Sequence, residues 1–194
     1  MATEGENSLK VTYIGKMYYY QEDFNDGDWG ILDPRGSVAI TPSGEATNRW
    51  LSYVSGTTLL SLDKSVVSAK NLVLEMKLMI GEDFNGGVSF RYDSDGAANN
   101  KTEIFAVNAD DHIGLSYGTK ASTRGSFYAM SANQWVYLKV VMDWETKTCT
   151  FYDVNGTVLK EKKNISQIDG ASLQIWSDGV SPLNIDDLKI YSVN

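Results

Sequence analysis

Cysteine, histidine and proline are scarce in this 194-residue chain, which has one Cys, one His and three Pro. The single cysteine, Cys149, cannot form an internal disulfide, and one histidine with one cysteine cannot complete a zinc centre. Cys149 lies in an apolar run, so we expect a small buried side chain rather than a nucleophile. The chain also has no run of about eighteen apolar residues, the minimum for a transmembrane helix.

Positive charge is in deficit as well. Seventeen Lys and Arg against 25 Asp and Glu give a formal net charge of −8. A surface of this sign repels nucleic-acid phosphates and anionic lipid headgroups, so we expect neither nucleic acid nor a membrane as a partner. It is compatible with neutral glycans and with Ca²⁺.

The N-terminal residues differ in character from the remainder. The segment MATEGENSLK lacks the basic-then-apolar pattern of a signal peptide. We interpret residues 1–8 as a terminal segment or linker and residues 9–194 as one domain, a length that single all-β domains reach. No internal repeat, low-complexity tract or Pro/Ser-rich stretch divides this domain.

Short runs of β-branched and aromatic residues dominate the chain, and helical periodicity is almost absent. We expect strands at residues 9–14, 18–24, 37–40, 50–54, 58–62, 72–80, 87–92, 103–108, 112–117, 135–143, 148–154, 172–176 and 183–191. Asn155-Gly156 between two apolar runs predicts a hairpin. The sequence therefore predicts an all-β fold, a two-sheet antiparallel β-sandwich (jelly roll).

Alternation within the expected strands predicts which side chains leave the core. Arg91 and Gln174 each lie between two apolar neighbours, and His112 and Trp176 each adjoin one apolar residue at the end of an expected strand, so we expect all four to face outward. The run at 135–142 is more continuously apolar, as is typical of a central strand.

The last third of the chain carries a pattern in three segments, NQWVYLKVVMD (133–143), TFYDVNG (150–156) and IDDLKIY (185–191). It resembles the concanavalin-A-like lectin/glucanase sandwich, including laminin-G-like domains. The opening EDFNDG (22–27) together with 185–188 also resembles the first and last strands of jelly-roll carbohydrate-binding modules. The resemblance implies a non-catalytic carbohydrate-binding module for a plant or microbial polysaccharide. Such a module would be a monomeric unit of a larger glycan-degrading protein, secreted or at the cell surface.

In such modules, acidic residues from the two ends of the chain often hold a structural calcium ion. The resemblance implies Asp23 and Asp187 as ligands, joined by Glu22 and Asn25. Ca²⁺ takes six to eight oxygen ligands at about 2.3–2.6 Å, and these side chains supply carboxylate and amide oxygens. The alternative is a set of solvated acids at strand ends.

A glycan site combines an aromatic face, on which the C–H surface of a sugar ring stacks, with planar polar side chains for its hydroxyls. The loop at 93–100 is a candidate rim, because binding loops are often held by rigid strands. Each candidate also has the plainer alternative of packing or solvated surface. The candidates are Trp176, Trp50 and Tyr92 for the aromatic part and Arg91, His112 and Gln174 for the polar part.

Two other classes of protein remain open. A glycoside hydrolase that retains configuration needs two carboxyl groups about 5–5.5 Å apart. The nearest stretch here has Glu103 and Asp110 seven positions apart, which departs from the glucanase pattern. A polysaccharide lyase would depend on His112 with Arg91 and Tyr92. A laminin-G-like adhesin or protein-interaction domain is the second alternative, and the fold alone does not separate them.

Overall fold

The structure is a computed structural model that describes residues 15–42, 48–82, 84, 88–93, 101–108, 112–118, 125–165, 167, 172–177 and 182–194. Within these ranges it contains thirteen strands and one short 3-10 helix, η1 (Lys64–Ser68). The strands are β1 (Lys16–Glu22), β2 (Leu32–Thr41), β3 (Trp50–Ser61), β4 (Asn71–Ile80), β5 (Val88–Asp93), β6 (Lys101–Asn108), β7 (His112–Gly118), β8 (Gly125–Ala129), β9 (Val136–Asp143), β10 (Thr148–Tyr152), β11 (Val158–Lys163), β12 (Ser172–Ser177) and β13 (Leu183–Val193).

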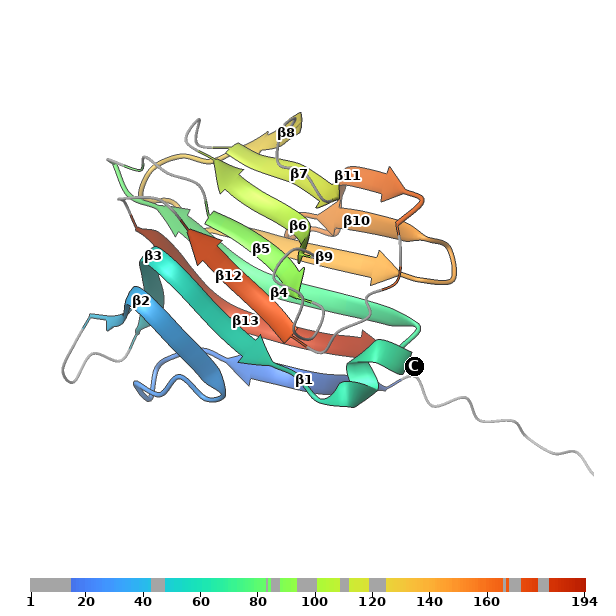
Figure 1. Ribbon diagram of the computed structural model, residues 1–194. Coiled ribbons are helices and arrows are strands. Elements are labelled where there is room, and N and C mark those ends of the chain that lie inside the picture. The colour runs from blue at the N-terminus through green and yellow to red at the C-terminus, as the bar shows by residue number, and fades with distance from the viewer. Residues whose placement is uncertain are drawn as a thin grey trace, which may run out of the picture.

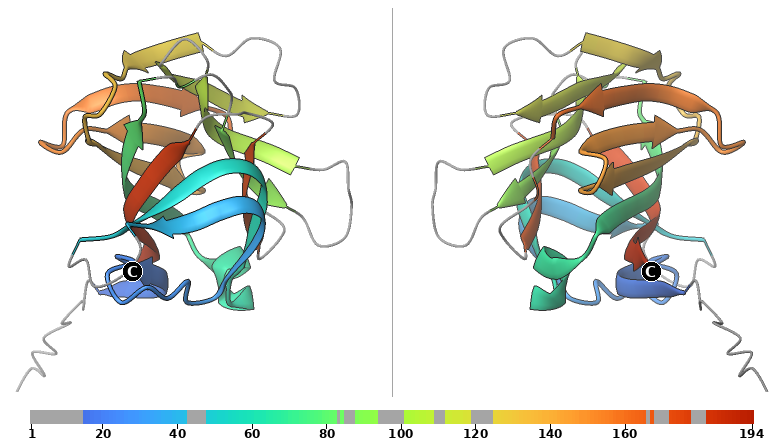
Figure 2. Two further views of the ribbon diagram at one scale, coloured as in Figure 1. Left: turned by 90° about the vertical axis from the view of Figure 1, so that its left-hand side faces the viewer. Right: turned by 90° about the vertical axis from the view of Figure 1, so that its right-hand side faces the viewer.

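Hydrogen bonds join all of these strands in one antiparallel path that folds over into two layers. The path runs β11-β10-β9-β4-β13-β3-β12-β5-β6-β7-β8, with β1 added to β13 and β2 added to β3. The β9 layer contains β11, β10, β9, β4, β13 and β1, and the β12 layer contains β12 and β5 to β8 (Figures 1 and 2). The predicted all-β antiparallel sandwich is confirmed.

Strands β2 and β3 bend from one layer into the other. The first part of β3 pairs with β13, and the part from Gly56 onward pairs with β12. Gly56 lies opposite Gly36, with φ angles of 112° and 122°, and a Cβ on Gly56 would lie 2.2 Å from the Arg35 carbonyl oxygen. The sequence predicts two strands here, at 50–54 and 58–62. The structure has one, because Gly56 lets the strand bend without ending.

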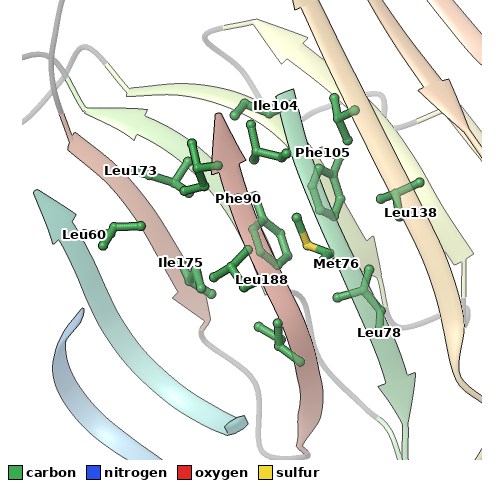
Figure 3. Packing of buried hydrophobic residues seen from close by; sticks show 14 of the residues in the cluster. Leu60, Met76, Leu78, Phe90, Ile104, Phe105, Leu138, Leu173, Ile175 and Leu188 are labelled. Atoms are coloured by element: carbon green, nitrogen blue, oxygen red, sulfur yellow. The ribbon is translucent and has the colours of Figure 1, made fainter. Parts of the chain in front are cut away.

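The core between the layers is aromatic at its centre. Phe90 of β5 stacks on Phe105 of β6, with ring centroids 4.2 Å apart, and Phe105 meets the edge of Phe151 of β10 at 6.3 Å. Figure 3 shows Phe90 and Phe105 facing Met76 across the core. Cys149 is fully buried, and burial raises the pKa of its thiol to about 12, so the expectation of a buried cysteine is confirmed.

The hairpin predicted at Asn155-Gly156 joins β10 to β11. Asp153 Oδ1 accepts the backbone N–H groups of Asn155 and Thr157 at 2.9 and 2.8 Å, and Gly156 takes φ 78°. Tyr152 pairs with Val158, so the loop is longer than the two-residue turn that Asn-Gly suggests.

The structure adds two strands to the predicted set. Strand β8 was not predicted, and β11 was expected only as the second apolar run of the Asn155-Gly156 hairpin. The predicted run at 9–14 lies outside the described residues. Within the part of the chain that the structure describes, no helix is both long and apolar enough to cross a membrane.

Candidate functional site

The outer side of β4 and β9 carries polar and aromatic side chains at alternate positions. The residues between them point inward and are buried in the core, whereas these outward residues are partly exposed. Strand register places Lys77 opposite Tyr137, Glu75 opposite Lys139, and Tyr152 of β10 on the far side of Lys139. We name the surface formed by Glu75, Lys77, Tyr137, Lys139 and Tyr152 the β4–β9 face.

Glu75 is the acceptor at the centre of this face. The Tyr191 hydroxyl of β13 donates to Glu75 Oε1 at 2.5 Å, and Lys139 Nζ lies 3.5 Å from the same oxygen. Burial disfavours the charged form of Glu75, whose side chain is 14% exposed, but the Tyr191 hydrogen bond and the charges of Lys139 and Lys16 outweigh it. The pKa of Glu75 therefore lies below its ordinary value, and the carboxylate is ionised at neutral pH.

Phenols beside Glu75 remain hydrogen-bond donors over the whole physiological pH range. Burial and the neighbouring carboxylate raise the pKa of Tyr137 to about 12 and shift the pKa of Tyr191 strongly upward. Tyr137 is half-buried, so part of its side chain is accessible. The face thus presents neutral donors, an anionic acceptor and two ammonium groups within a few strands.

Further aromatic rings extend the face at both of its ends. Trp135, which directly precedes β9 and lies two residues before Tyr137, is 37% exposed. Its ring meets the edge of Trp50 at a centroid distance of 5.9 Å. At the other end Tyr18 of β1, 47% exposed, packs against Tyr191 at 5.2 Å.

A hollow of about 240 Å³ adjoins the β4–β9 face, lined by Lys139, Val141, Tyr152 and Gly156. Gly156 comes from the tip of the β10–β11 loop, and the other three come from adjacent strands. The lining combines an aromatic ring, an aliphatic side chain and an ammonium group. That mixture is typical of small-molecule sites, in which apolar walls surround a few polar groups.

Sequence patterns did not point to this face, because the run at 135–142 was interpreted only as a continuously apolar central strand. β9 is a central strand, between β10 and β4, but its outward residues include Tyr137 and Lys139. The signal was present, because Tyr137 and Lys139 alternate with the buried Leu138 and Val140. When tyrosine is counted only as a core residue, the run contains a single polar position, and its alternation of buried and exposed residues is not recognised.

The Tyr191–Glu75 hydrogen bond gives a pH-dependent prediction. Tyr191→Phe leaves a mostly buried carboxylate without its closest donor, so we expect it to lower the free energy of unfolding by about 1–3 kcal/mol at pH 7. The folded-state pKa of Glu75 is depressed below 4.5, so its stabilising ionisation is present above that pH and is lost as the pH falls through the depressed value. Urea unfolding at pH 7, 5 and 3 should show the gap between wild type and Tyr191→Phe narrowing toward pH 3. A gap that stays constant would contradict the assignment.

Two of the sequence-predicted ligand residues lie side by side on the other layer. Arg91 of β5 and Gln174 of β12 are directly paired, and both make further interactions. Leu173 and Ile175 are buried in the core, as alternation predicts. Gln174, however, is only 4% exposed, which differs from the expected outward and solvent-facing position. Alternation predicts the side of the strand but not what covers that side.

The remaining predicted ligand residues are more scattered. Trp176 pairs with Ser89, His112 begins β7, and Tyr92 pairs with Leu173, but the side chains of Trp176, His112 and Tyr92 lie outside the described part of the structure. So does most of the predicted rim, at 94–100. Trp50 lies instead with Trp135, at one end of the β4–β9 face.

The predicted proximity of the two chain ends is confirmed, since Glu22 of β1 pairs with Leu188 of β13. A cavity of about 250 Å³ there is lined by Gln21, Glu22, Asp23, Asp187 and Lys189. Three of the four predicted calcium ligands therefore share one cavity. The fourth, Asn25, is not among the lining residues and accepts the backbone N–H of Arg49 at 2.9 Å.

The acidic side chains of this cavity already have partners. Glu22 Oε1 accepts the N–H groups of Asp23 and Phe24, each at 3.0 Å, and Lys77 Nζ lies 2.5 Å from Asp187 Oδ2. Among the described residues, no three His, Cys, Asp or Glu side chains are arranged to hold a metal ion. Lys77 neutralises Asp187 in this arrangement, so a Ca²⁺ ion would have to compete with its ammonium group.

Calcium at this cavity stays a prediction that a melting experiment tests. A melting temperature that rises with millimolar CaCl₂ and returns to its starting value with EDTA would support it. An unchanged melting temperature would contradict it. Lys77→Met serves as the sensitised variant, since it removes the ammonium group that competes for Asp187.

Comparison with known proteins shows the fold. No protein-family model matches the chain, and no curated protein matches it. A sialidase structure matches with TM-score 0.64 and 10% identity, over 90% of this chain but 18% of its own. Domain 4 of AbnA, a GH43 extracellular arabinanase from Geobacillus stearothermophilus solved with arabinotriose, matches with TM-score 0.60 and 14% identity, over 91% of this chain and 93% of its own. Carbohydrate binding module CBM66 from Bacillus subtilis matches with TM-score 0.53 and 14% identity, over 81% and 92%.

These matches define the class of fold. The chain has the concanavalin-A-like lectin/glucanase sandwich, as the sequence resemblance implies, and shares it with carbohydrate-binding modules and other glycan-binding domains. The chain spans less than a fifth of the sialidase but nearly all of the two modules. Identities of 10–14% show the fold and leave the ligand to be argued from the site.

Proposed function

We propose that this chain is a non-catalytic carbohydrate-binding module whose β4–β9 face holds a stretch of polysaccharide. One observation carries the proposal. Two half-buried tyrosines, Tyr137 and Tyr152, flank the ion pair of Glu75 and Lys139 beside a hollow large enough for part of a sugar.

Each part of the face suits one part of a sugar ring. The C–H surface of a pyranose packs on an aromatic ring, and burying it removes apolar area worth about 25 cal/mol per Å². The ionised Glu75 accepts hydrogen bonds from sugar hydroxyls, and Lys139 donates to them. Hydrogen bonds to charged groups are roughly twice as strong as neutral ones. All of these side chains are held on adjacent strands, which keeps the face preorganised.

The charge state of the face favours binding over hydrolysis. A glycosidase general acid needs a carboxyl group whose pKa is raised toward neutrality. Glu75 has the opposite shift, because Tyr191 and Lys139 stabilise its ionised form. We therefore assign no catalytic residue on the β4–β9 face.

A structural neighbour supports a proposal for the setting of the module. Domain 4 of AbnA is one domain of an extracellular arabinanase, and it matches this chain over nearly its whole length. We infer by analogy that this chain is a secreted or cell-surface module of a larger glycan-degrading protein.

Affinity electrophoresis tests the proposal, with gels containing xylan, mannan, β-glucan, arabinan, pectin or alginate. We expect retardation on at least one polymer, without release of reducing sugar or of unsaturated product. Ile31→Ala, which alters an exposed apolar residue away from the face, should be retarded like wild type. Product release would contradict the non-catalytic assignment. Absence of retardation on every polymer would favour an adhesin or protein-interaction domain instead.

A further inference from the structure

A second and larger pocket lies at the opposite end of β10 from the β4–β9 hollow. It has a volume of about 450 Å³ and is lined by Trp144, Lys147, Asn164, Ile165 and Gln167. Trp144 directly follows β9, Lys147 directly precedes β10, and Asn164 directly follows β11. We name it the Trp144 pocket.

Hydrogen bonds fix the walls of this pocket. Ile165 N–H donates to the Lys147 carbonyl at 3.1 Å, and Trp144 N–H donates to the Lys70 carbonyl at 3.0 Å. The Gln167 side-chain amide donates to the Val67 carbonyl at 2.8 Å, which ties the far wall to η1. Segments from three parts of the chain therefore hold the pocket in shape.

A buried donor on this lining lacks an acceptor. Trp144 is 8% exposed, and its indole Nε1 has no hydrogen-bond partner in the part of the chain that the structure describes. An unpaired buried N–H group destabilises a fold, so each such group calls for a physical explanation. Among the described lining residues, the indole is the one aromatic ring.

The charge of the lining is positive although the protein is acidic overall. Lys147 is exposed, and none of the described lining residues is an acid. Two acids flank Trp144 in the chain: Glu145 is paired with Lys70 at 2.9 Å, and Asp143 accepts the backbone N–H of Thr146 at 2.9 Å. Asn164 and Gln167 add carboxamides, which donate and accept. A cation with several N–H donors and no carboxylate fits an anionic, oxygen-rich ligand.

We propose that the Trp144 pocket binds a carboxylate-bearing sugar, a hexuronate residue. Lys147 pairs with the carboxylate, the carboxamides of Asn164 and Gln167 serve the hydroxyls, and the Trp144 side chain forms part of the pocket lining. The choice of a sugar acid over other carboxylates rests on the proposed function. The preference for an anionic ligand rests only on the charge and the hydrogen-bond donors of the pocket.

The indole N–H resonance of Trp144, assigned with Trp144→Phe, reports on the pocket in a titration of ¹⁵N-labelled protein. We expect D-glucuronate or D-galacturonate to shift this resonance, and D-glucose to leave it unchanged. Lys147→Gln should weaken the uronate dissociation constant about tenfold or more, since it removes a charged donor. Lys160→Gln, which removes an exposed lysine on β11 outside the lining, should bind like wild type.

Three results would overturn the proposal: no shift with either uronate, an equal shift with glucose, or unchanged affinity in Lys147→Gln. Acetate binding as tightly as the uronates would overturn the sugar part of it. Tyr137→Ala should keep the uronate response, because Tyr137 belongs to the other site. Failure at the Trp144 pocket is thereby separated from failure of the β4–β9 face.

Discussion

Tyr137→Ala is expected to weaken binding of the retarded polysaccharide about 30-fold or more without unfolding the domain. Tyr137 lies at the centre of the β4–β9 face, opposite Lys77 and two residues along β9 from Lys139. Truncating a central aromatic anchor typically costs about 2 kcal/mol or more of binding free energy, which corresponds to that factor. Titration calorimetry with an oligosaccharide of the bound polymer measures it.

Two further variants test which part of the face contributes to binding. Tyr137→Phe keeps the ring and should retain most of the affinity. Tyr152→Ala removes the second ring, beside the hollow, and should also weaken binding. Circular dichroism should give the same strand signal for all three variants. If Tyr137→Ala bound the polysaccharide as tightly as wild type, the β4–β9 face would not be the binding site.

Phe105→Ala is expected to produce the largest loss of stability, about 3–5 kcal/mol in the free energy of unfolding. Phe105 is fully buried, stacks on Phe90 and contacts the edge of Phe151, so it links both layers. Removing its ring leaves a cavity at the centre of the core. Domains of this kind have about 5–15 kcal/mol in total, so the loss is a large share.

Urea unfolding followed by tryptophan fluorescence measures this loss. Phe105→Leu keeps most of the side-chain volume and should lose distinctly less. Val154→Ala, at a residue 71% exposed in the β10–β11 loop, should change little. A loss below about 1 kcal/mol for Phe105→Ala would contradict the central place of this ring in the core.

Much of the fold follows from local patterns in the sequence. Alternation places Leu173 and Ile175 in the core, and Asn155-Gly156 marks the β10–β11 hairpin. The acidic segments at the two ends do lie on paired strands. These features depend on side-chain periodicity and turn chemistry, which are readable over a few residues.

The site was harder to predict because it depends on contacts between distant segments. The interactions of Glu75 with Tyr191 and Lys139 join β4, β13 and β9. The contact between Trp50 and Trp135 joins residues 85 positions apart in the sequence. Nothing local indicates such pairs. Gln174 shows the complementary error: the alternation of β12 is right, but its outer side is covered. The bend at Gly56 also depends on its partner, Gly36.

The most direct measurement of the central claim is chemical-shift mapping of the ¹⁵N,¹³C-labelled domain during titration with an oligosaccharide of the retarded polymer. We predict that the largest chemical-shift changes fall on Tyr137, Lys139, Tyr152 and Glu75, and that the changes at Trp135 are smaller. Largest shifts around Arg91 and Gln174, on the β12 layer, would contradict it and return the site to the face that strand alternation first suggested.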